Sequence, residues 1–424
     1  MTTGLTALQS LPTLTPDARL LFSTRVVRLF AYGALSVVLV LYLAQAGLAE
    51  AQIGTLLTLT LIGDTAISLW ITTHADRIGR RRMLIAGAGL MLLAGLAFAV
   101  THNFALLVIA ATVGVLSPSG NEVGPFLSIE QAALAQLLPG AQRTRVFAWY
   151  NLVGSFATAA GALSGGLLAQ MLQGAGLSFF ESYRVIVVGY AASGVMLGLM
   201  FAPLSPAVEA PANLSQVMLR DRPSLGLRDS RNIVLKLAAL FSLDAFAGGF
   251  VIQSLLAYWF HLRFGVEPGV LGGIFFGANI LAGVSALAAA RVAARFGLIN
   301  TMVFTHIPSS LLLMLVPLMP NLPLAVTVLL LRFSISQMDV PTRQSYTLAV
   351  VEPDERSAAS GLTGVARTIG ASLAPMLAGP LLANPALSST PFFIAGGLKI
   401  VYDLALYRAF RAIRPPEEAK EERP

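Results

Sequence analysis

The stretch Ile71–Leu84, ITTHADRIGRRRML, gathers one aspartate and four arginines into seven positions of a chain in which only 12% of residues are charged. Long apolar segments flank this stretch, over residues 52–74 and 82–101. Because positively charged residues stay on the cytoplasmic side of a membrane, a basic turn between two apolar segments predicts a short cytoplasmic loop.

The composition places the chain in a membrane. Its 424 residues are 56% hydrophobic, and the charged share is half of the quarter or so that is typical of soluble domains. The formal charge of +7, from 28 basic and 21 acidic residues, lies mostly in loops, so it follows membrane topology and does not indicate nucleic acid. We therefore expect an integral membrane protein whose surroundings are the lipid bilayer.

The sequence carries no signature of an enzyme or a metalloprotein. The absence of cysteine excludes disulfides and thiolate metal sites, and the four histidines, His74, His102, His261 and His306, are scattered. Nucleophile-elbow, zinc-protease and phosphate-loop motifs are absent. We expect no enzymatic activity, no metal and no cofactor. The first 18 residues contain no Lys or Arg, so they are expected to be a cytoplasmic tail and not a signal peptide.

Twelve apolar segments are long enough to cross a bilayer, which takes about 20 residues per helix. They lie roughly at 20–47, 52–74, 82–101, 104–137, 146–172, 183–204, 232–261, 269–293, 298–319, 322–350, 358–383 and 389–410. We predict an all-α integral membrane fold of twelve transmembrane helices in two pseudo-symmetric six-helix bundles, 1–204 and 232–424, the second with a short cytoplasmic tail. Residues 205–231 are the predicted cytoplasmic linker, in which 213–219 form either a short interfacial helix or irregular chain.

The distribution of Lys and Arg predicts the orientation. Alternate loops and the tails are basic, whereas the loops on the other side hold only Arg184 and Arg263. The positive-inside rule then places both termini in the cytoplasm, in a multi-pass protein of the inner (plasma) membrane. Arg25 and Arg28, in the first turns of span 1, are expected to extend back to the lipid headgroups.

The two halves of the chain repeat each other. Residues 30–33, Phe-Ala-x-Gly, followed by Tyr42 in span 1, have the same spacing as residues 246–249, again Phe-Ala-x-Gly, followed by Tyr258 in span 7. Internal repeats of this kind are typical of transporters that are built from two related bundles.

The charged loop resembles the signature of the major facilitator superfamily of transporters, Gly-x-Leu-Ala-Asp-Arg-x-Gly-Arg-Arg, between transmembrane helices 2 and 3. Thr72 and His74 stand where the signature has its first glycine and its leucine. The matching residues are Ala75, Asp76, Arg77, Gly79, Arg80 and Arg81. The resemblance implies a monomeric carrier that works by alternating access, with this loop as a gating element. It also implies a central cavity between spans 1, 4, 7 and 10, with the candidate lining residues Tyr32, Glu122, Asp244, Arg332 and Asp339.

Span 5 resembles a second signature of that family. Gly161-Ala-Leu-Ser-Gly165-Gly166 is similar to the antiporter core Gly-Pro-x-x-Gly-Gly, with Ala162 in place of the proline. This resemblance favours antiport, although small residues also serve helix packing alone. The arginine-containing helix-4 motif of many proton-coupled members is absent, which leaves a standard drug–proton assignment unsupported.

Span 4 is predicted to break within Leu116–Pro125, LSPSGNEVGP, because proline and glycine interrupt helices. Discontinuous helices mark substrate or ion sites in transporters, so Asn121 and Glu122 are candidate binding groups. Alternatively, Glu122 caps the helix that restarts after the break, where negative charge is favourable. Glu130, further along the span, is expected to pair with the basic loop 77–82.

Span 10 places Arg332, Asp339, Arg343 and Tyr346 on one helical face. Intramembrane charges face protein or water and pair with one another. The prediction is therefore an Arg332–Asp339 or an Asp339–Arg343 ion pair. In a functional role, either arginine would contact an anion, or Asp339 would carry a proton.

Two further carboxyls lie near the middle of spans, Asp64 in span 2 and Asp244 in span 7, without an opposite charge one turn away. Each is either paired with another helix or protonated, and both are candidate proton carriers. Arg367 in span 11 is a further candidate for contact with the solute. Lys399 and Asp403, one turn apart in span 12, are expected to neutralise each other in part.

These features predict a secondary active transporter that moves a small organic solute, is coupled to protons and favours efflux by antiport. A proton symporter or uniporter for nutrient uptake is the alternative, as is a non-transporting membrane sensor with the same helices. The charge of the solute is open, because the buried arginines favour an anion or zwitterion and the apolar walls favour a lipophilic drug.

Overall fold

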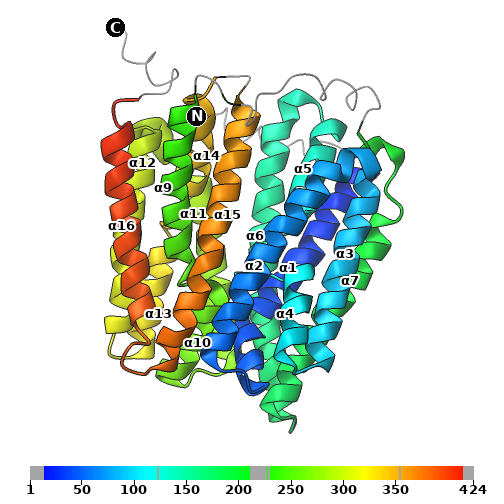
Figure 1. Ribbon diagram of the computed structural model, residues 1–424, viewed down its shortest axis with the longest axis vertical. Helices are drawn as coiled ribbons and strands as arrows, with labels where there is room; N and C mark the ends of the chain where they lie inside the picture. Colours follow the sequence, from blue (N-terminus) through cyan, green and yellow to red (C-terminus); the bar gives the residue numbers. More distant parts are fainter. Residues whose placement is uncertain (1–13, 122–123, 211–226, 228–229, 353–354, 414–424) are drawn as a thin grey trace, which may run out of the picture.

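The computed structural model describes residues 14–121, 124–210, 227, 230–352 and 355–413, and the regular structure in these ranges is helical throughout (Figure 1). The first half contains α1 (Pro16–Gln45), α2 (Glu50–Ile78), α3 (Arg80–Val100), α4 (Phe104–Val113), α5 (Phe126–Leu137), α6 (Gly140–Gly174), α7 (Phe179–Phe201) and the short η2 (Pro206–Val208). The second half contains α9 (Arg231–Gly249), α10 (Gln253–Phe264), α11 (Pro268–Phe296), α12 (Leu298–Leu315), η3 (Val316–Leu318), α13 (Leu322–Phe333), α14 (Asp339–Ala349), α15 (Arg356–Ala383) and α16 (Thr390–Phe410). The bundle boundaries at residues 204 and 232 stay predictions, and residues 213–219 lie outside the described ranges.

All the predicted spans are helical, which confirms the all-α membrane fold. In the described part of the chain, nine stretches are long and apolar enough to cross a membrane, with α9 and α10 counted as one. The helices α4 and α13 are apolar but shorter. The remaining span, α16, packs against α9 and α12.

Span 4 is interrupted, as predicted. Its helix stops at Val113 and resumes at Phe126. Between them, Gly120 and Gly124 have φ angles of +70° and +80°, in the left-handed region that glycine adopts without strain. Glu122, the principal candidate in this break, lies outside the described residues.

Spans 7 and 10 are interrupted as well, and the sequence analysis did not predict these two breaks. The first break separates Gly249 from Gln253, directly after a pair of glycines, which are weak helix formers. The second separates Phe333 from Asp339. Pro341 then lies in the first turn of α14, where its missing N–H is not needed for an intrahelical bond.

The same helix pairs pack in both halves, which confirms the predicted repeat. The helix α1 packs against α6 as α9 packs against α15, and α3 packs against α7 as α12 packs against α16. A Cβ atom added to Gly33 of α1 would lie 2.1 Å from the carbonyl oxygen of Thr158. One added to Gly249 of α9 would lie 2.4 Å from the carbonyl oxygen of Ala371. Matched glycines therefore allow corresponding close contacts in the two halves.

The two halves meet along α2–α15 and α6–α11. We call the end where α2 joins α3 the basic end, which is at the top of Figure 1, and the other the opposite end. A Cβ atom on Gly54 of α2 would lie 2.4 Å from the carbonyl oxygen of Pro375, and one on Gly166 of α6 would lie 2.3 Å from that of Pro268. Both contacts lie toward the opposite end, where α2 and α11 begin.

Hydrogen bonds also join the halves at the interrupted spans. The Ser254 amide, just after the break in span 7, donates to the carbonyl oxygen of Pro118 in the break of span 4, at 3.2 Å. Nearer the opposite end, the Tyr258 hydroxyl donates to Glu50 Oε1 at 2.9 Å. The breaks of spans 4 and 7 thus meet at the boundary between the halves.

Candidate functional site

A buried carboxylate in the second half, Asp244 of α9, is shared by cations from three other helices. Lys399 Nζ of α16 lies 2.6 Å from Oδ1. Arg343 Nη1 of α14 and Arg367 Nη1 of α15 lie 3.3 and 3.5 Å from Oδ2. Asp244 is 4% exposed, so these contacts take the place of water. Of the two predicted alternatives for Asp244, pairing with another helix or protonation, the structure shows pairing with other helices.

The span-10 charges join the same cluster. Arg343 Nη1 donates to Asp339 Oδ2 at 2.8 Å, one helical turn apart, which is one of the two predicted pairs. Arg332 lies beyond the break, with its guanidinium carbon 4.9 Å from the centre of the Phe333 ring. Arg332 Nε is buried and has no hydrogen-bond partner in the described structure, although Arg332 interacts electrostatically with Asp339 and Asp244.

His306 of α12 links the cluster to a third carboxylate. Its Nδ1 lies 3.0 Å from both carboxylate oxygens of Asp403, and its Nε2 lies 3.7 Å from Asp244 Oδ1. Lys399 interacts electrostatically with Asp403, in line with the expected partial neutralisation, but each residue has a nearer partner on another helix. His306 was not among the predicted site residues, although a polar ring within an apolar span is costly unless it has a partner.

The first half contains a separate buried ion pair. Arg28 donates to both oxygens of Glu130, at 2.9 and 2.7 Å, and both side chains are fully buried. The hydroxyl groups of Thr24 and Tyr150 also donate to this carboxylate. Two predictions were therefore wrong: Glu130 does not pair with the basic loop, and Arg28 does not extend to the headgroups. A bidentate pair satisfies both charges inside the bundle, which neither predicted contact could do.

Arg25, the other basic residue of span 1, is also buried within the first half. Its guanidinium carbon lies 4.2 Å from the centre of the Tyr150 ring, and its Nη2 lies 3.4 Å from Asn151 Oδ1. Tyr150 thus contacts Arg25 through its ring and Glu130 through its hydroxyl. The prediction that Arg25 extends to the headgroups was also wrong.

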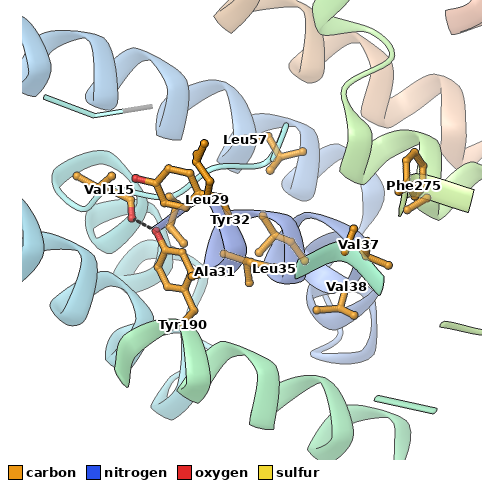
Figure 2. Close-up of a cluster of buried hydrophobic side chains, with 14 of the residues drawn as sticks. Leu29, Ala31, Tyr32, Leu35, Val37, Val38, Leu57, Val115, Tyr190 and Phe275 are labelled. Atoms are coloured by element: carbon orange, nitrogen blue, oxygen red, sulfur yellow. Dashed lines mark hydrogen bonds between the residues drawn. The ribbon is translucent and has the colours of Figure 1, made fainter. Parts of the chain in front are cut away.

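The remaining first-half candidates lie apart from the Asp244 cluster. Tyr32 is fully buried and stacks on Tyr190 with ring centres 6.1 Å apart, and the Tyr190 hydroxyl donates to the Val115 carbonyl (Figure 2). Asp64 of α2 is buried and interacts electrostatically with Tyr190. Asn121 is exposed. The structure therefore brings together Asp244, Asp339, Arg332, Arg343 and Arg367, but neither Tyr32 nor Asp64 joins them.

The predicted gating loop is held at the start of α3. Gly79 has a φ angle of +114°, which ends α2, and Arg80 Nε lies 2.8 Å from Asp76 Oδ1. Glu209, which follows η2, accepts hydrogen bonds from the backbone amides of Arg80 and Arg81, at 2.5 and 3.2 Å. This capping role of Glu209 was not predicted, because the contact joins residues more than a hundred positions apart in the chain. The chain that leaves the first half is thereby anchored to the basic loop.

Comparisons with known sequences agree with this architecture. A sequence model of the Major Facilitator Superfamily matches residues 21–375. An uncharacterized membrane protein of Saccharomyces cerevisiae is 30% identical over 424 residues, covering 94% of this chain and 94% of the yeast protein. The quinolone resistance protein NorA of Staphylococcus aureus is 25% identical over 139 residues, covering 33% of this chain and 34% of NorA.

Solved structures share the fold. A D-xylose–proton symporter aligns over 92% of this chain and 97% of its own, with a TM-score of 0.73 and 14% identity. The nucleoside transporter NupG aligns over 94% of this chain and 100% of its own, with a TM-score of 0.72 and 14% identity. At these identities the likeness establishes the architecture alone.

Proposed function

The chain belongs to the Major Facilitator Superfamily, and we propose that it moves a small organic solute by alternating access, driven by protons. It is a multi-pass membrane transporter and not an enzyme, as the family and the transporters of the same fold indicate. We further propose a monomer in the plasma membrane, with both termini and the basic end in the cytoplasm, because basic residues mark the cytoplasmic side.

The observation that carries proton coupling is the sharing of Asp244 among Lys399, Arg343 and Arg367. Each opposite-charge contact at about 4 Å contributes about 4 kcal/mol of attraction at an effective dielectric constant of about 20. A proton on Asp244 removes these attractions together. Because the partners belong to α14, α15 and α16, protonation changes the forces that hold four helices of the second half in place. That link between one proton and many helices supports Asp244 as the coupling carboxyl.

Alternating access would then be a rocking of residues 1–204 against 232–424. The close contacts of Gly54 with Pro375 and of Gly166 with Pro268 support a state that is closed at the opposite end. Release of the solute on the other side would require these contacts to separate. The loop Asp76–Arg81 would be the gating element at the basic end.

The test is a proton-flux assay in proteoliposomes. A pH gradient is imposed, the pH of the lumen is recorded as a pool of solutes is added, and variants are compared with the unaltered protein. Asp244→Asn and Asp339→Asn probe the cluster, and Glu122→Gln probes the break in span 4. Glu181→Gln is the matched control, because it removes a carboxylate from an exposed pair with Arg184.

Proton movement that depends on solute, survives in Glu181→Gln and is lost in Asp244→Asn supports the proposal. Undiminished proton movement in Asp244→Asn would remove this carboxyl from the mechanism. Solute movement without proton movement would leave a uniporter. No movement of any solute, together with intact binding, would favour a membrane sensor.

Proton-driven export by antiport is the second candidate. The similarity to NorA, a quinolone resistance protein, favours it, as does the resemblance of Gly161–Gly166 to the antiporter signature. Helix packing also accounts for these glycines, because a Cβ atom on Gly161 would lie 2.0 Å from the Phe30 carbonyl oxygen. The sign of the proton movement in the same assay separates exchange from cotransport.

A further inference from the structure

We propose that the cluster around Asp244 binds the negatively charged group of an organic anion, and that the anion crosses the membrane together with a proton held by Asp244. This inference rests on the proposed function, and it names the class of solute and the sense of coupling. It is carried by the balance of charge in the cluster, by two buried guanidinium donors that lack hydrogen bonds and by the contact of Arg367 with the shared carboxylate.

The cluster contains more permanent cations than carboxyls. The cations are Arg332, Arg343, Arg367 and Lys399, and the carboxyls are Asp244, Asp339 and Asp403, with His306 between two of the carboxyls. The helices that contribute these groups add no further acid within their own bounds. Their other charged residues are Arg231, Lys236, Arg356 and Arg408. Within the described residues, a bound anion would therefore offset an excess of positive charge.

Two guanidinium groups in the cluster have donors without hydrogen bonds. Arg332 Nε and Arg367 Nη1 are both buried and have no hydrogen-bond partner among the described residues. Arg367 Nη1 lies 3.5 Å from Asp244 Oδ2, an oxygen that already accepts from Arg343 at 3.3 Å. A buried donor that is left unpaired is costly, and a guanidinium group fits a carboxylate, sulfonate or phosphate with two parallel bonds.

The arginine of α15 is also within reach of a solute. The Arg367 side chain is 33% exposed, through atoms other than its buried Nη1, whereas that of Asp244 is 5% exposed. An anion could therefore contact Arg367 from the open side while Asp244 contacts it from the interior. The anion and Asp244 would then share the Arg367 cation.

This sharing sets the sense of coupling. When Asp244 is ionised, its carboxylate is the counter-anion of Arg343, Arg367 and Lys399. When Asp244 holds a proton, Arg367 and Lys399 lose this counter-anion and Arg343 keeps only Asp339, so an external anion can take the place of Asp244. Proton and anion then bind together, which gives cotransport. A cationic solute would instead compete with the proton for Asp244, which gives exchange.

The test uses three aromatic probes of similar shape: benzenesulfonate, neutral benzenesulfonamide and cationic benzamidine. Benzenesulfonate keeps its charge at both about pH 5.5 and about pH 8, so any dependence of binding on pH belongs to the protein. Binding to the purified full chain is measured by the shift of its thermal midpoint. The variants are Arg332→Gln, Arg367→Gln and Arg367→Lys. The last variant keeps the positive charge but removes the guanidinium group that can donate two parallel hydrogen bonds. Arg356→Gln is the control, since Arg356 is an exposed arginine of the same helix.

We expect benzenesulfonate to stabilise the unaltered protein and Arg356→Gln, with an affinity at least about tenfold higher at the acidic pH. Benzenesulfonamide and benzamidine should have no such effect. Arg332→Gln and Arg367→Gln should abolish the benzenesulfonate shift, and Arg367→Lys should weaken it. Equal or stronger stabilisation by benzamidine, no shift with benzenesulfonate, or an anion effect that persists in both glutamine variants would overturn the proposal.

Proteoliposomes separate failure of this inference from failure of the proposed function. Benzenesulfonate should drive protons into the lumen with itself. Proton movement driven by benzamidine, in the opposite direction, would overturn the anion site and leave proton-coupled transport standing. Benzenesulfonate binding that requires Arg332 and Arg367 but moves no proton would keep the anion site and overturn both cotransport and proton coupling.

Discussion

Glu130→Gln is expected to destabilise the first half strongly, because it breaks an ion pair from which water is excluded. The carboxylate accepts hydrogen bonds from Arg28 at 2.9 and 2.7 Å and from Thr24 at 2.9 Å. Removal of one partner from a buried pair costs about 3–5 kcal/mol. At roughly 2–4 °C per kcal/mol for a unit of about 200 residues, the thermal midpoint should fall by about 6–20 °C.

A double variant separates the net contribution of the pair from the penalty of a lone charge. Arg28→Met combined with Glu130→Met replaces both groups with apolar side chains and leaves no uncompensated charge. Such replacements are often neutral or stabilising, so most of the lost stability should return. Glu181→Gln is the control, because its pair with Arg184 is exposed and should contribute less than about 1 kcal/mol.

The assay is the thermal unfolding of the purified variants in one detergent, followed by tryptophan fluorescence. The reasoning is refuted if Glu130→Gln shifts the midpoint no more than Glu181→Gln does. It is also refuted if the double variant loses as much stability as the two single changes added together. Because we assign the pair a structural role, the double variant should keep solute-dependent proton movement.

Three further changes test other contacts. Gly54→Trp should hold the two halves apart at the opposite end. A maleimide that cannot cross the membrane should then label the cysteine of Ser36→Cys faster in the Gly54→Trp variant than in the protein that keeps Gly54. Equal labelling rates would contradict this, and the chain has no cysteine of its own that could react. If His306 passes protons to Asp403, His306→Ala should slow solute-dependent proton movement at least about tenfold with little change in solute affinity. An unchanged rate of lumenal pH change would exclude this relay. Glu209→Gln should weaken the cap on α3 by about 0.5–2 kcal/mol and speed amide hydrogen exchange at Arg80, whereas unchanged exchange would show that the cap is not stabilising.

Features that lie within one helix could be predicted from the sequence. Hydropathy located the spans, proline and glycine located the break in span 4, and spacing along one helix found the pair of Asp339 and Arg343. For Lys399 and Asp403, the same spacing predicted an electrostatic interaction but missed the nearest partner of each residue. Each of these two residues lies closer to a partner on another helix, and helix–helix contacts are not encoded in the spacing along one chain segment.

Residues whose roles depend on distant parts of the chain could not be found this way. Glu130 pairs with Arg28, 102 positions earlier, and Asp244 pairs with Lys399, 155 positions later. His306 was set aside because histidines are scattered along the sequence, yet the fold places it between Asp244 and Asp403. Electrostatic cost indicated that these groups need partners, but only the packing of the helices identified them.

The two bundles carry their buried charge in different ways, and this difference bears on how such a protein can change over evolutionary time. In the first half, the carboxylate of Glu130 is enclosed by Arg28, Thr24 and Tyr150, so the network is self-contained. In the second half, Arg367 Nη1 is buried without a hydrogen bond among the described residues, and in our proposal a bound anion completes that network. A duplicated architecture permits such a division of labour, with one copy kept as a frame and the other free to acquire new cargo. Substitutions that alter what is carried should therefore accumulate in the second copy.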